Sequence, residues 1–256
     1  MLRRVFSPAT VATTGVAMVA AALLGLGTGE AGAASSSFSL TYATDSDGTA
    51  LVRWAPCVRT ASGDVTQVIR YKVRPAGHPG RVRLVKRAIA RLHDATGLHF
   101  RYAGRTSYIP QARVLTHRLR AHDMETHTGV PFVVAWARKG TQPGGSTLLT
   151  GDEAGVGSIT WRYSLRSDLR ISDAAVVMRR GPTSLRPGFG PGGTVGTLLL
   201  HELGHAVGLQ HVYDETQVMN PVVGPWSPSR YADGDRRGLA RVGAAAGCLR
   251  GPWLPA

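Results

Sequence analysis

Three histidines and a glutamate lie within one short stretch of this chain, at spacings that suit a metal ion. The stretch reads H-E-x-x-H-x-x-G-x-x-H and runs from His201 to His211. His201 and His205 are four residues apart, so on a helix their side chains lie one turn apart on the same face. Two imidazole nitrogens placed in this way can bind one Zn²⁺ at about 2.0–2.1 Å. Glu202 lies close enough to act on a water molecule at the metal without binding the metal itself.

A glycine near the end of this motif predicts a sharp turn after the helix. Gly208 can adopt a positive φ, so it can end the helix and reverse the chain. The turn would bring His211 back toward the helix as a third ligand. Three protein ligands leave the fourth position of a tetrahedral zinc to water, as in catalytic rather than structural sites. The spacing therefore predicts a hydrolytic zinc centre.

A methionine follows the motif at a distance that makes the pattern more specific. It stands in Met219-Asn220-Pro221, eight residues after His211. With the histidine motif, this segment resembles the metzincin metallopeptidases, and among them the matrixins. The resemblance implies that Met219 forms an apolar floor beneath the histidines. It also implies an endopeptidase with one catalytic zinc, which hydrolyses a protein or peptide with a metal-activated water and Glu202 as general base.

The resemblance also implies a fold. We expect an α+β, metzincin-like catalytic domain with a twisted mixed β-sheet, an active-site helix and a small C-terminal subdomain. In this family an edge strand above the cleft pairs with the substrate, and both Phe132–Trp136 and Gly157–Trp161 could be that strand. Val212 follows the third histidine, where matrixins usually carry serine. The branch of the family, the cleavage preference and any calcium requirement therefore stay open.

Residue patterns along the chain place the other elements. Alternating or continuous β-formers predict strands at 68–73, 98–103, 131–138, 157–163 and 171–178. Apolar residues at helical spacing predict an amphipathic helix over 81–96, ended by Gly97. Thr194 is the expected N-cap of the active-site helix, and a last helix is expected at 231–246. We expect residues 34–50, which are rich in Ser, Thr and Ala, to be a flexible leader, and 51–256 to form the catalytic domain.

The first residues have the organisation of a secretory signal peptide, which we assign to 1–33. Arg3 and Arg4 precede an apolar run at 11–26, and Ala31-Gly32-Ala33 matches the small-residue cleavage pattern. The run is short and interrupted by glycine, which argues against a membrane anchor. We therefore expect a secreted, extracellular bacterial protein with no membrane span after cleavage.

Two cysteines, Cys57 and Cys248, stand near opposite ends of the expected domain. In an exported chain an even number of cysteines most simply forms a disulfide. The alternative is that Cys57 caps the zinc, as the propeptide cysteine does in matrixins. The surrounding Trp54-Ala55-Pro56-Cys57-Val58 lacks that family's pattern, so we expect a Cys57–Cys248 disulfide.

The chain is strongly basic, with 30 Lys and Arg against 16 Asp and Glu and a formal net charge of +14. A basic secreted protein adheres to polyanions, so a cell-surface polymer is a candidate partner. No basic patch is interleaved with aromatic residues and no known nucleic-acid module is visible, which excludes nucleic acid. We expect a monomer. Two alternatives to a peptidase stay open: a basic cell-surface binding protein on the same scaffold, and a zinc amidase that acts on a cell-wall polymer. The intact Glu202 favours an enzyme.

Overall fold

The computed structural model describes residues 37–45, 48–60, 62–111, 123–142, 145–163, 169–181 and 183–250. These residues belong to one compact unit, Ala34–Ala256. The expected signal peptide at 1–33 lies outside the described residues. Within the described part of the chain, no helix combines the length and the apolar character needed to cross a bilayer.

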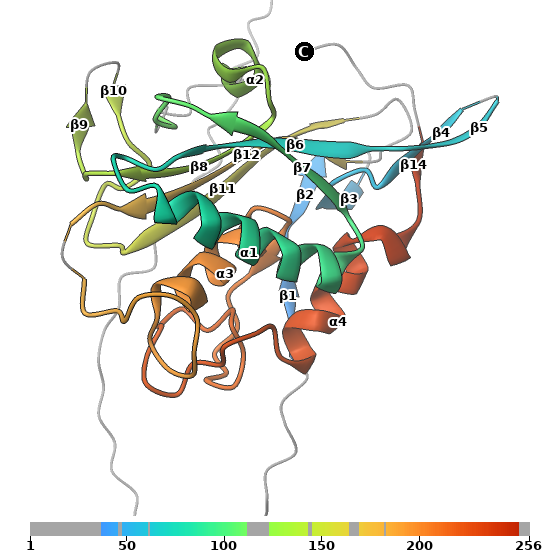
Figure 1. Ribbon diagram of the computed structural model, residues 1–256. Coiled ribbons are helices and arrows are strands. Elements are labelled where there is room, and N and C mark those ends of the chain that lie inside the picture. Colours follow the sequence, from blue (N-terminus) through green and yellow to red (C-terminus); the bar gives the residue numbers. More distant parts are fainter. Residues whose placement is uncertain are drawn as a thin grey trace, which may run out of the picture. The chain divides into compact units, whose positions relative to one another are not determined.

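A seven-stranded mixed β-sheet forms the frame of this unit (Figure 1). The strands follow the order β2-β3-β12-β8-β6-β7, and β11 pairs with β12 outside that path. The pairs β12–β8, β8–β6 and β6–β7 are parallel, whereas β11 runs antiparallel to β12. The strands are β2 (Tyr42–Asp45), β3 (Gly48–Arg53), β6 (Val68–Arg74), β7 (His99–Arg105), β8 (Phe132–Ala137), β11 (Gly155–Tyr163) and β12 (Leu169–Arg179).

Helices cover the two faces of the sheet unequally. In Figure 1, α1, α3 and α4 lie on one side of the sheet and the short α2 lies on the other. The larger core cluster fills the first side, and smaller clusters lie against the second. Because β8 is buried on both faces, its sequence is a continuous apolar run rather than an alternating one. The helices are α1 (Gly80–Thr96), α2 (Asp123–Thr128), α3 (Val195–His205) and α4 (Asp233–Val242), with a 3-10 turn at Ala244–Ala246.

The amphipathic helix predicted over 81–96 is confirmed as α1. Its apolar stripe is buried, including Val85, Ile89 and Leu92, while Arg83 and Lys86 are exposed. The helix ends at Gly97, whose φ of 68° lets its N–H reach the carbonyl of His93 at 2.7 Å. The α+β class with its mixed sheet and active-site helix is likewise confirmed.

The expectation of a flexible leader is wrong for the part of 34–50 that the structure describes. Ser39–Leu40 forms β1, which pairs antiparallel with β13 (Leu209–Gln210) just before His211. Strands β2 and β3 form a hairpin in which Asp45 pairs with Gly48. These strands are short, and β1 finds its partner far along the chain, so local composition does not reveal them.

Two small sheets complete the unit. One is the hairpin of β9 (Thr141–Gln142) and β10 (Gly145–Ser146). The other contains β4 (Cys57–Thr60), β5 (Gly63–Thr66) and the C-terminal β14 (Leu249–Arg250). The predicted Cys57–Cys248 disulfide is present where β4 and β14 pair. The guanidinium of Arg53 also donates to the carbonyl of Gly247 at 2.8 Å, so the C-terminal segment is fixed twice.

Removing this disulfide should destabilise the fold without disturbing the histidine site. The bond closes a loop with a sequence separation of 191 residues. We expect a Cys57→Ser/Cys248→Ser variant to lose about 2–5 kcal/mol of unfolding free energy, because the unfolded chain regains conformational entropy. Urea denaturation with and without reductant would measure this. An unchanged transition midpoint would contradict it.

Candidate active site

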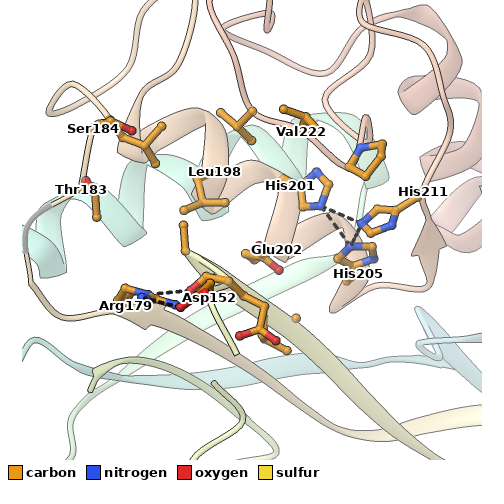
Figure 2. A pocket seen from close by; sticks show the side chains of 18 residues that line it. Asp152, Arg179, Thr183, Ser184, Leu198, His201, Glu202, His205, His211 and Val222 are labelled. Carbon is orange, nitrogen blue, oxygen red and sulfur yellow. Dashed lines mark hydrogen bonds and ion pairs between the residues drawn. The ribbon is translucent and has the colours of Figure 1, made fainter. Parts of the chain in front are cut away.

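The active-site helix α3 begins where the sequence predicts. Thr194 caps it by accepting a hydrogen bond from the backbone N–H of Thr197 at 3.0 Å. The helix is buried on nearly all sides, as expected of a helix that is apolar all round. This burial fixes its position, and it presents His201 and His205 one turn apart toward a cavity (Figure 2).

The three predicted histidines converge on one point. The Nε2 atoms of His201, His205 and His211 form a triangle with sides of 3.1, 3.1 and 3.2 Å. Nitrogens that share a tetrahedral zinc at about 2.0–2.1 Å would lie about 3.3 Å apart. The donor set therefore fits one zinc ion in both geometry and chemistry.

Backbone carbonyls set the orientation of two of these rings. The Nδ1 atom of His201 lies 2.8 Å from the carbonyl oxygen of Val218, and that of His205 lies 2.9 Å from that of Leu209. When Nδ1 carries the proton and donates it to a carbonyl, Nε2 keeps its lone pair for a metal. Burial lowers the pKa of His201 to about 3 and that of His205 to about 4. Both imidazoles are thus neutral at pH 7, the form that binds zinc.

The turn that brings in the third histidine requires glycine for two reasons. Gly208 has a φ of +105°, and a Cβ there would lie 2.8 Å from the carbonyl oxygen of Val52.

Hydrogen bonds from the N-terminal strands hold the same turn. The carbonyl of Gly208 accepts a hydrogen bond from the N–H of Thr41 at 2.8 Å. The indole of Trp54 donates to the carbonyl of Ala206 at 2.9 Å. The N-terminal strands therefore hold the turn from which His211 projects, a role that the sequence analysis missed.

Met219 is buried against α3. A Cβ on Gly204 would overlap the sulfur of Met219, so the methionine packs directly on the helix backbone. A buried carboxylate holds this segment: Asp235 on α4 accepts hydrogen bonds from the N–H groups of Val218 and Met219 at 2.8 and 3.1 Å. Asp235 carries no signal in the sequence, because only the tertiary fold brings it to this turn.

Glu202 lies beside the histidine triangle and faces strand β11 (Figure 2). Only 4% of its surface is exposed. Burial raises the pKa of its carboxyl to about 8, and a hydrogen bond from the backbone N–H of Gly157 opposes that rise. A Cβ at Gly155 would lie 2.8 Å from a carboxylate oxygen of Glu202. Gly155 thus makes room for this carboxylate, and Gly157 makes room for the backbone of α3.

The two candidates for the substrate-pairing strand are now distinguished. Strand β8, which contains Phe132–Trp136, pairs with β12 on one side and β6 on the other. Among the described strands, β11 pairs only with β12. Strand β11 also borders a cavity of about 670 Å³ that contains the three histidines and Glu202. Gly157–Trp161 therefore lies on the edge strand at the cleft, and Phe132–Trp136 does not.

We expect a Gly157→Ala substitution to impair catalysis more than stability. The new Cβ would lie 2.6 Å from the Cβ of His205, so β11 must move away from α3. Because misplacement by about 1 Å can reduce rates strongly, we expect kcat/KM to fall on the order of 10- to 100-fold. The matched control is Ser158→Ala, at the neighbouring position of the same strand. Equal activity of both variants in a peptide-cleavage assay would contradict this account.

The comparison with protein families agrees with this geometry. The model of the family described as Matrixin matches residues 65–242. No curated protein matches the chain. Among solved structures, a match is High choriolytic enzyme 1, a hatching enzyme zinc-protease from the medaka fish Oryzias latipes. It has 15% sequence identity and a TM-score of 0.33, and the match covers 68% of this chain and 88% of that chain. The family match spans most of the chain and includes the histidine motif, so this protein belongs to the matrixin family and is a zinc metalloendopeptidase.

Proposed function

We propose that the protein is a secreted endopeptidase in which His201, His205 and His211 hold one zinc ion and Glu202 is the general base. The observation that carries the proposal is the Nε2 triangle, with sides of 3.1–3.2 Å, beside a buried carboxylate. When bound, zinc supplies a Lewis acid that polarises the scissile carbonyl and acidifies water. The remaining steps belong to the residues of the chain.

Glu202 would move the proton in this reaction. A zinc ion held by the neighbouring histidines would favour the ionised form of its carboxyl against the effect of burial. The carboxylate would then take a proton from the attacking water and later deliver it to the leaving amine. The N–H of Gly157 donates to this carboxylate and keeps it directed toward the cleft. Because the carboxylate is almost fully buried, few other conformations are open to it.

Strand β11 would orient the substrate. One edge of β11 is paired with no other described strand, and its backbone N–H and C=O groups can pair with an extended peptide whatever its sequence. Apolar side chains in the same cavity, including Leu185, Leu198 and Val223, would accept an apolar side chain of the peptide. The cleft therefore suits cleavage within a peptide chain, and it does not require one defined sequence.

Secretion is supported by two separate features. Residues 1–33 have the pattern of a signal peptide. The Cys57–Cys248 disulfide is of a kind that persists in oxidising, extracellular surroundings. A possible partner outside the cell is an anionic surface polymer, given the net charge of +14.

One experiment separates this function from the binding protein and the cell-wall amidase. The purified protein is incubated with a mixed peptide library and with peptidoglycan, each with and without a zinc chelator. We expect peptide cleavage that the chelator abolishes and that added zinc restores. If the protein releases fragments from peptidoglycan and cleaves no peptide, it is an amidase and not a peptidase. A zinc-loaded protein that cleaves neither substrate would support the binding protein.

A further inference from the structure

A second cavity lies where α1 meets α4 and the segment that precedes α4. It has a volume of about 330 Å³ and shares no lining residue with the cavity that contains the histidines. Three arginines line it: Arg91 on α1, Arg230 in the segment before α4, and Arg236 on α4. Asp94 is its only acidic lining residue. Three positive charges thus face one negative charge in a small space.

These arginines have no acidic partner in the described part of the chain. The ion pairs found there lie elsewhere, on Arg59, Arg70, Lys139 and Arg179. The pKa of Arg91 is lowered, first by burial and then by the nearby positive charges of Arg87 and Arg230. An anion in the cavity would relieve this repulsion.

Two sides of the cavity are held in place without any ligand. The guanidinium of Arg91 donates to the carbonyl of Ser229 and stacks on the ring of Phe189, with its Cζ 4.0 Å from the ring centroid. The neighbouring Tyr231 is buried, and its hydroxyl donates to the carbonyl of Leu200 at 2.7 Å. The backbone on both sides of Arg230 is therefore anchored, so binding would have to order arginine side chains but little backbone.

What sets these arginines apart is their position. Arg230 and Arg236 are exposed, as are Arg83 and Arg237, but only the first two line the cavity together with the half-buried Arg91. The lining arginines come from three different segments and meet at one place. Guanidinium groups present paired N–H donors that match the oxygens of phosphate, and a net charge of two suits a doubly charged anion.

We propose that this cavity binds a phosphate group, either as the free ion or as part of an anionic polymer. Binding would leave the catalytic cleft open, because the two cavities have no lining residue in common. A polymer that carries phosphate groups could then hold the enzyme at a surface while it cleaves peptides. The proposal does not depend on the peptidase activity.

The test measures binding of inorganic phosphate, polyphosphate and acetate to the zinc-loaded protein by isothermal titration calorimetry. Arg230→Gln/Arg236→Gln should weaken phosphate binding about tenfold or more, since hydrogen bonds to charged groups are lost. The matched control, Arg83→Gln/Arg237→Gln, removes the same charge from exposed positions on α1 and α4 outside the cavity and should bind like the parent. Peptide cleavage should be unchanged in both variants, and circular dichroism would verify their fold.

The outcomes are distinct. Binding of both inorganic phosphate and polyphosphate through Arg230 and Arg236 assigns the cavity to the phosphate group itself. Binding of polyphosphate alone, lost in the same variant, assigns it to a polymer. If phosphate binding weakens equally in both double variants, it depends only on the net charge of the protein, and the proposal is overturned. So would acetate binding as tightly as phosphate, or phosphate binding that neither variant changes.

Discussion

Replacing Glu202 with glutamine is expected to lower kcat for peptide hydrolysis by about 10²–10⁴-fold, the usual contribution of a general base. Glutamine has nearly the same shape but cannot accept the proton of the attacking water. The three histidines are untouched, so the zinc content of the variant should equal that of the parent. Steady-state kinetics and metal analysis on the same preparation would check both parts.

The matched control is Glu153→Gln. Glu153 lines the same cavity, but it is exposed and its carboxylate accepts a hydrogen bond from the N–H of Gly151. We expect this variant to keep most of its activity. Full activity in Glu202→Gln, or an equal loss in both variants, would show that Glu202 is not the base.

Replacing His205 with alanine should remove both zinc and activity. Two remaining nitrogens cannot complete a zinc site, so we expect zinc affinity to fall by more than about 100-fold, beyond the effect of losing an outer partner of a ligand. Competition with a chromophoric chelator would measure the affinity. Together with Glu202→Gln, this variant separates the loss of the metal from the loss of the base.

An exposed histidine provides the control for His205→Ala. His78 lies in the turn before α1, and its side chain faces solvent. The variant His78→Ala should bind zinc and cleave peptide like the parent. If His205→Ala keeps stoichiometric zinc while its circular dichroism is unchanged, the proposed ligand set is wrong.

Local patterns in the sequence were sufficient for much of the fold and for the centre of the site. The spacing of His201 and His205 follows from the helical period, and Gly208 marks the turn by its own backbone freedom. The amphipathic stripe of α1 likewise depends only on neighbours along one helix. Each of these signals is complete within a short stretch of sequence.

The features that the sequence analysis missed depend on contacts between distant segments. Asp235 reaches the segment around Met219 only after α4 has packed. Gly155 and Gly157 are needed only because β11 crosses α3, where a Cβ at either position would clash with the helix. A strand as short as the two-residue β1 carries almost no periodic signal, because its stability comes from the partner strand. Periodicity alone cannot predict such contacts.

The position of β1 has a practical consequence for recombinant work on this protein. A fragment trimmed to the family match at 65–242 would omit Ser39–Leu40, the partner of the strand just before His211. It would also lack both cysteines. Such a fragment could carry the whole histidine motif and still bind zinc poorly. Expression boundaries should therefore be chosen from the strand pairing and not from the extent of family similarity.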